Sequence, residues 1–142
     1  MENSRIIIPY ELEANSVKLK IIPSNIKYGI IELNNETREF FPGYRKQFIL
    51  QTDIRLFVMH LSGSEKGTEI GSVYGGYLSH PRPRDIKEKF FRQIPDCRHH
   101  IKGSFKRWYD EHPEIESEHY IRIYKLEEEL FRLETISPEQ NS

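Results

Sequence analysis

Short stretches in which apolar and polar residues alternate recur along the whole chain. In the clearest one, residues 16–23, Val17, Leu19 and Ile21 alternate with two lysines. A period of two predicts a β-strand that buries one face and exposes the other. Six further stretches carry a strand pattern, with turn residues between them, at 28–33, 46–53, 54–63, 72–78, 119–127 and 128–136.

Other segments predict turns, extended chain or short helices. Pro9 interrupts an extended segment at 5–13, and turns are expected at 23–25 and near Thr52–Asp53. Single helical segments are expected at 34–42 (capped by Asn34 or Asn35), at 85–93 and at 104–114 (capped by Ser104). The helical residues expected to face the core are Ile86, Phe90, Phe105, Trp108 and Tyr109.

The element pattern predicts a fold that is mainly β. The helices are too few and too short to cross over between parallel strands. We therefore expect a β-barrel or sandwich-like barrel of about seven strands with short helices at its ends. The length of 142 residues suits one domain, at 1–136, followed by a flexible tail at 137–142.

Charge is distributed unevenly along the chain, although the net charge is only −1. Residues 80–107 hold nine Lys/Arg against three acids, and residues 108–142 hold ten acids against three Lys/Arg. A basic block of this kind is able to face phosphate groups, whereas the acidic part favours solubility. The other explanation is a solvated, charged helix face.

Cysteine content and the N-terminal sequence indicate the compartment. Cys97 is the single cysteine, which excludes an internal disulfide and a structural metal site built on several thiolates. No secretory signal and no apolar run long enough to span a membrane is visible. We expect a cytoplasmic protein that does not insert into a membrane.

Two stretches resemble the B3-type DNA-binding domain, in particular the recognition domains of bacterial restriction endonucleases of the EcoRII and BfiI type. The first stretch matches at Pro23, Ser24, Asn25, Ile26, Ile30, Leu33, Glu39, Phe41 and Pro42. The second matches at Phe105, Trp108, Tyr109, His112, Pro113, Ile115, Ile121, Ile123, Phe131, Arg132 and Leu133. The chain departs from the family at 117–119, where Ser-Glu-His replaces Gly-Asp, and at 81–102, which looks like a basic insertion.

The resemblance implies a mainly β fold, a seven-stranded open β-barrel (DNA-binding pseudobarrel). It also implies sequence-specific binding of double-stranded DNA by a monomer that reads the major groove with two projecting arms. It implies the target-recognition part of a restriction-modification or related defence system, with no cofactor and with cleavage in a separate nuclease domain or subunit. The arms would be 20–29 and 60–77, with backbone contacts from 43–46 and from the basic block. The expected DNA-binding residues are Lys20, Ser24, Asn25, Lys27, Tyr28, Arg45, Lys46, His60, Ser62, Ser64, Lys66, Thr68, Tyr74, Arg82 and Arg84.

Several alternatives remain open from the sequence alone. Ser24 and Asn25 are also typical of a turn that satisfies its own backbone, and 60–77 of an ordinary solvated hairpin tip. The chain is also compatible with a pseudobarrel that binds RNA or a modified base, with a protein-interaction barrel, or with a small metal-dependent nuclease. Asp96, Cys97 and His99–His100 are the residues from which a metal site or a thiol nucleophile would have to be built.

Overall fold

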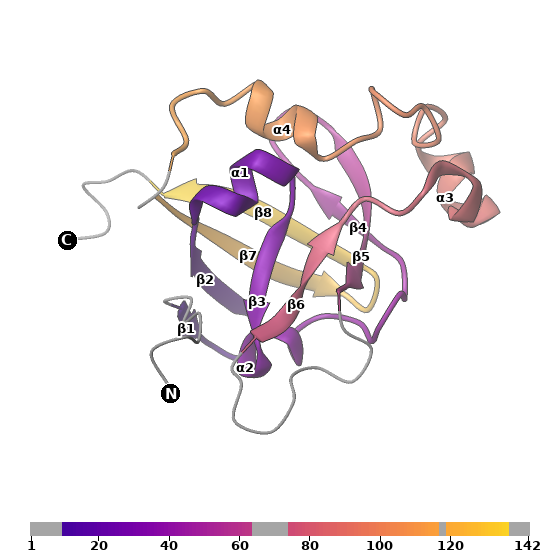
Figure 1. Ribbon diagram of the computed structural model, residues 1–142. Coiled ribbons are helices and arrows are strands. Elements are labelled where there is room, and N and C mark those ends of the chain that lie inside the picture. Colours follow the sequence, from indigo (N-terminus) through magenta and orange to yellow (C-terminus); the bar gives the residue numbers. More distant parts are fainter. Residues whose placement is uncertain (1–9, 64–73, 117–118, 137–142) are drawn as a thin grey trace.

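The computed structural model describes residues 10–63, 74–116 and 119–136. These residues form one strongly curled, barrel-like sheet with short helices around it (Figure 1). The prediction of a mainly β, barrel-like fold is therefore confirmed. Among the described residues, no helix has the length and apolar character needed to cross a bilayer.

Eight strands make up the sheet, in the order β1-β2-β7-β8-β4-β5-β6-β3. They are β1 (Tyr10–Leu12), β2 (Ser16–Lys20), β3 (Ile31–Asn34), β4 (Phe48–Gln51), β5 (Leu56–Ser62), β6 (Tyr74–Ser79), β7 (Tyr120–Glu127) and β8 (Leu130–Ile136). The seven predicted strands are present. The eighth is β1, which pairs with β2 in the part of the chain where only an extended segment was expected.

Strand register places the alternating apolar residues on one inner face. Val17 lies opposite Ile123 and Leu19 opposite Ile121, so β2 and β7 contribute to the same core. All strand pairs are antiparallel except β4 with β8, which run parallel. Because side chains alternate between faces, the outer faces of the same strands are left for polar residues or for a covering segment.

The helices are α1 (Pro23–Tyr28), α2 (Asn35–Arg38), α3 (Glu88–Gln93) and α4 (Lys106–Asp110), with a 3-10 turn η2 (Pro83–Asp85). Helices α1 and α4 lie together at one end of the barrel and α2 lies at the other (Figure 1). Asn34, one of the two predicted capping residues, caps α2 in a reciprocal capping box with Thr37. The aromatic face of 104–114 is buried as predicted, with Phe105 and Trp108 fully inside the core.

The turn predicted at 23–25 is wrong, because these residues begin helix α1. Proline suits the first position of a helix, where its missing N–H is not needed. Gly29 then ends the helix with a left-handed φ of 68°. The pattern Pro-Ser-Asn with a glycine four residues later is as typical of a short helix as it is of a turn.

The segment 81–103 lies over the outer face of β4 and β5, on the side where α3 appears in Figure 1. A second apolar cluster forms there, made of Ile49, Val58, Ile86, Phe90, Ile94 and Cys97. Ile86 and Phe90 face inward as predicted, but toward this second cluster and not toward the main core. The suspected insertion is therefore part of the folded body of the protein.

Candidate nucleic-acid interface

The first predicted arm, 20–29, is packed against the body of the protein. The side chain of Asn25 is 1% exposed, and its Oδ1 accepts a hydrogen bond from the backbone N–H of Glu32 at 3.2 Å. Ser24 donates its hydroxyl to the carboxylate of Glu32. The prediction that Asn25 stands on a projecting tip is wrong, and both polar groups are used inside the fold.

The other members of this segment are more accessible but lie on a helix or strand. Lys27 is exposed and its ammonium lies 5.2 Å from the ring centre of Tyr28, which is itself 62% exposed. Lys20 is partly buried on β2. Both Lys27 and Tyr28 therefore belong to the end of the barrel where α1 meets α4.

The second predicted arm begins and ends at the opposite end of the barrel. Ser62 is the last residue of β5 and Tyr74 the first of β6, and Tyr74 pairs with Asn34, next to α2. Three predicted contact residues, Ser64, Lys66 and Thr68, lie outside the described residues. Because α1 lies at the α4 end and these strand ends lie at the α2 end (Figure 1), the described geometry contradicts a clasp formed by two arms on one side.

Basic side chains from two distant segments meet beside β5. The amide of Gln47 donates to the backbone carbonyl of Asp85 at 2.7 Å and accepts from the backbone N–H of Lys87 at 2.9 Å. This 7% exposed glutamine thereby joins the segment 43–47 to the segment 82–87. We call the result the Arg45 surface, which comprises Arg45, Lys46, His60, Ser62, Arg82, Arg84 and Lys87.

The cations of the Arg45 surface are largely free to bind an external anion. Arg45, Lys46, Arg84 and Lys87 are exposed, and none forms an ion pair with another described residue. Arg82 forms a surface ion pair with Asp85 at 3.0 Å, which is worth little in water. Five cations with one paired acid make this a positively charged surface.

Arg45 has an unusual backbone conformation. Its φ is 60°, the one left-handed φ found among the described non-glycine residues. Its N–H donates to the carbonyl of Leu61 at 2.9 Å, and its guanidinium donates to the hydroxyl of Tyr44 at 3.2 Å. A long charged side chain at a position that glycine would occupy more readily indicates that the side chain itself is needed.

Neutral polar side chains on the outer face of β5 lie near these cations. His60 pairs with Ser79 across β5 and β6, and Ser62 pairs with Tyr77 in the next outward row. Burial, then the nearby charges of Arg45 and His80, lower the pKa of His60 to about 4. At neutral pH, His60 therefore presents a neutral ring with hydrogen-bonding nitrogens in the middle of a cationic surface.

The low pKa of His60 predicts a specific pH dependence of stability. The unfolded chain takes up a proton near pH 6.5, whereas the folded chain does so only near pH 4, so lowering the pH favours unfolding. Between pH 7 and pH 5 we expect His60 to remove about 2 kcal/mol from the free energy of unfolding. Urea unfolding of the wild type and of His60→Gln at both pH values tests this, since the variant lacks this contribution. Equal pH dependence of the two proteins would contradict it.

Sequence reasoning missed two residues that organise this surface. Gln47 gave no signal, because a single glutamine before an apolar strand is common on any protein surface. His80 donates its Nε2 proton to the carbonyl of Cys97 at 3.1 Å and lies close enough to His60 to affect its pKa. Its position just before Pro81 in the basic block was the one available hint.

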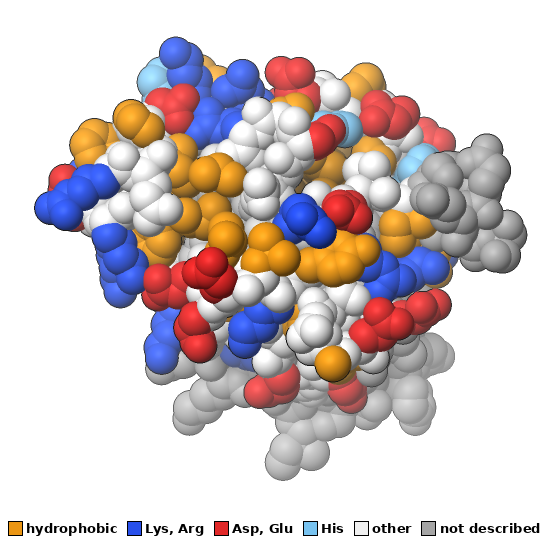
Figure 2. All heavy atoms as spheres, turned by 180° about the vertical axis from the view of Figure 1, so that it is seen from behind, with side chains coloured by type: hydrophobic (Ala, Val, Ile, Leu, Met, Phe, Trp, Pro, Cys, Tyr) orange, Lys and Arg blue, Asp and Glu red, His pale blue; other side chains and the backbone are white. Residues whose placement is uncertain are grey.

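The basic block is partly explained by internal ion pairs. Lys89, Arg98 and Lys106 pair with Glu129, Glu88 and Asp110 at 2.8, 3.7 and 3.7 Å. The explanation as a solvated, charged face thus accounts for part of the block. The face seen from behind in Figure 2 is mixed in sign, because basic and acidic side chains are interleaved there with apolar ones.

A histidine–aspartate pair at the α4 end fastens the helix to the sheet. His112 donates from Nδ1 to the carbonyl of Trp108 at 2.8 Å and from Nε2 to Asp53 at 2.7 Å, so both ring nitrogens are in use. Burial lowers the pKa of His112, but the hydrogen bonds to Asp53 and to the Trp108 carbonyl, together with the charges of Asp53 and Glu114, outweigh it, so the pKa lies above its usual value. Because both ring nitrogens are engaged in these contacts, His112 has a structural role at this end of the barrel.

The residues considered above for a metal site or a thiol nucleophile do not form such a site among the described residues. Among the described residues, no group of three or more His, Cys, Asp and Glu side chains is close enough to hold a metal ion. Asp96 is bound by Arg55, and Cys97 is 1% exposed. Burial raises the pKa of the Cys97 thiol, which disfavours the reactive thiolate.

No family model, no curated protein and no solved structure matches this chain. The resemblance to B3-type domains stays a prediction. A function is therefore inferred from the geometry and charge of the Arg45 surface.

Proposed function

We propose that the protein binds double-stranded DNA through the Arg45 surface. The observation that carries this proposal is the meeting of two basic segments, separated by about forty residues in sequence, at the side chain of Gln47. Clustered cations without acidic partners are the usual footprint of a surface that binds the DNA backbone. His60 and Ser62 lie on β5, and the two segments that carry the cations are joined by the side chain of Gln47, which favours a defined register on the duplex.

The arrangement of charge within the surface suits a duplex. Arg45 lies close enough to His60 to lower its pKa, and Gln47 bonds the segment that carries Arg82 and Arg84 to the segment that carries Arg45 and Lys46. Such cations fit phosphates, whereas the neutral donors and acceptors of His60 and Ser62 fit base edges or sugars. His60 and Ser62 are thus the candidates for contacts within a groove.

The role of this binding in a cell is part of the same proposal. The resemblance to restriction-endonuclease recognition domains supports a target-recognition role, with cleavage by a separate domain or subunit. Selection of bound sequences from a random duplex library tests this role directly. Equal recovery of all sequences would remove the specificity part of the proposal and leave binding to the backbone.

Lys46→Ala is expected to weaken duplex binding about fivefold to tenfold at 0.1 M salt, because one phosphate contact is lost. The slope of log affinity against log salt concentration should fall by about one contact. Fluorescence anisotropy with a labelled duplex of about 20 base pairs, titrated between low and moderate salt, measures both quantities.

Two matched variants make this test specific. Lys125→Ala removes the same charge from an exposed position on β7, three strands away from β5 in the sheet order, and is expected to change neither quantity. Arg45→Gly is expected to weaken binding as Lys46→Ala does while leaving the protein as stable or slightly more stable, because glycine suits the left-handed backbone. Equal weakening by Lys125→Ala, or tighter binding of the wild type to duplex RNA, would overturn the proposal.

A further inference from the structure

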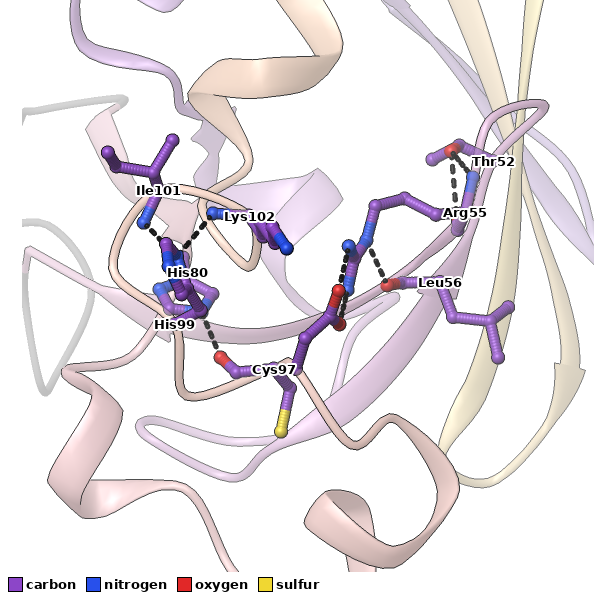
Figure 3. A network of polar contacts seen from close by, with 9 residues as sticks. Thr52, Arg55, Leu56, His80, Cys97, His99, Ile101 and Lys102 are labelled. Carbon is purple, nitrogen blue, oxygen red and sulfur yellow. Dashed lines mark hydrogen bonds and ion pairs between the residues drawn. The ribbon is translucent and has the colours of Figure 1, made fainter.

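Ile101 is held in an exposed position at the tip of a tight turn. Its side chain is 63% exposed, the highest fraction among the large apolar residues described. The ring of His99 accepts hydrogen bonds at Nδ1 from the backbone N–H groups of Ile101 and Lys102, at 3.2 and 3.1 Å (Figure 3). The backbone N–H of Gly103 donates to the carbonyl of His99 at 2.8 Å and closes the turn.

The base of this turn is fixed to the barrel. Arg55 on the β4–β5 turn binds the carboxylate of Asp96 with two hydrogen bonds, at 3.0 and 2.5 Å (Figure 3). The next residue, Cys97, is buried in the second apolar cluster, and His80 binds its carbonyl. Gly103 passes so close that an added Cβ would lie 2.4 Å from the same carbonyl oxygen. Ile101 is therefore exposed because these contacts hold the turn in one conformation.

The surroundings of Ile101 carry basic and neutral groups. Residues 97–109 contain no aspartate or glutamate, and four of the five residues around the tip are basic or imidazole side chains: Arg98, His99, His100 and Lys102. The rings of His99 and His100 are stacked at 5.2 Å between centres. An isolated apolar side chain next to such groups in the sequence fits a polyanion that has an apolar interior, which describes the stacked bases beneath the phosphates of DNA.

The turn is continuous with the Arg45 surface. Arg98 donates to the carbonyl of Ile86 at 2.5 Å, next to the segment that carries Arg82 and Arg84. His80 contacts Cys97 and also influences the pKa of His60. A duplex lying on the Arg45 surface would thus have the tip of the turn at its border.

We infer that residues 99–102 form a wedge that enters the minor groove of bound DNA, with the Ile101 side chain packed against a base step. This inference rests on the proposed DNA binding by the Arg45 surface. Apolar side chains used in this way partly unstack a base step and bend the duplex. Lys102 and the two histidines would then contact the phosphates on either side of the groove.

The test replaces Ile101 with serine and measures binding and bending separately. Ile101→Ser is expected to weaken binding about tenfold, since an apolar contact is lost. The salt slope should stay at the wild-type value, because the variant removes no charge. A duplex labelled with a donor and an acceptor dye at its two ends should show less bending by energy transfer than it does with the wild type.

The control is Ile54→Ser, because Ile54 is another exposed isoleucine, 38% exposed on the β4–β5 turn. This variant should bind and bend DNA as the wild type does. Unchanged urea midpoints for both variants would show that the fold is intact. Wild-type affinity and bending by Ile101→Ser would overturn the wedge while leaving the proposed function standing. If the wild type binds no duplex, or binds anionic lipid vesicles through Ile101 instead, both proposals fail.

Discussion

Replacing Gly29 with alanine is expected to lower the free energy of unfolding by about 3 kcal/mol, through two separate effects. The φ of 68° at Gly29 disfavours any residue with a Cβ by about 1–2 kcal/mol. In addition, an added Cβ would lie 2.8 Å from both Cα and Cβ of Lys106, so helix α4 would have to move at a cost of about 1–3 kcal/mol. Urea unfolding followed by tryptophan fluorescence measures the loss, since Trp108 lies on α4.

The close approach at Gly29 also explains why α1 is not an arm. Lys106 donates its ammonium to the carbonyl of Ile26 at 3.0 Å, and Tyr109 donates its hydroxyl to the carbonyl of Ile30 at 2.8 Å. Both bonds hold the C-terminal end of α1 against α4. The matched control is Gly43→Ala, where the nearest atom to an added Cβ is Cδ of Lys46 at 3.7 Å, and where we expect a change within about 0.5 kcal/mol. Equal stability of the two variants would show that α1 does not pack tightly against α4.

Phe90→Ala is expected to cost about 3 kcal/mol, at the low end for a buried phenylalanine because its cluster is small and lies near the surface. Phe90 is 2% exposed and anchors α3 on Ile49 and Val58 of the sheet. The neighbouring Phe91 is only partly buried, with the Arg98 guanidinium 4.8 Å from its ring centre. We expect Phe91→Ala to cost about 1 kcal/mol.

The comparison of these two variants decides what the segment 81–103 is. If the segment is part of the folded body, Phe90→Ala lowers the urea midpoint of the whole protein and also weakens DNA binding, because Arg82 and Arg84 lose their position beside Arg45. If it were an independent appendage, hydrogen exchange would increase in 81–103 alone while the strands kept their protection. That second outcome would contradict the role assigned to the second apolar cluster.

Local sequence patterns were sufficient for most of the secondary structure. Strands are recognisable by alternation, which depends only on neighbouring residues and on a buried inner face. The cap of α2 was predicted as Asn34 or Asn35, and the structure shows Asn34, which exchanges hydrogen bonds with Thr37 within one helical turn. Burial of Phe105 and Trp108 followed from helical spacing. These features are local, or require no more than that a core exists somewhere.

Features that join distant parts of the chain were not readable in this way. Asn25 was placed on an exposed tip because its residue type is compatible with a turn, whereas its burial depends on Glu32 and on the packing of α1 against α4. The pairing of β4 with β8 in parallel likewise reflects a long-range choice among many possible partners.

The candidate site shows the same division. The chain's residue types alone established that Arg45, Lys46, Arg82 and Arg84 were basic and available. Only the fold brings the segment of Arg45 and Lys46 next to the segment of Arg82 and Arg84, because Gln47 forms hydrogen bonds to residues about forty positions away in sequence. The fold also places α1 away from both segments. Hydrogen bonds between distant segments depend on the course of the backbone in three dimensions, which a local pattern of residue types does not determine.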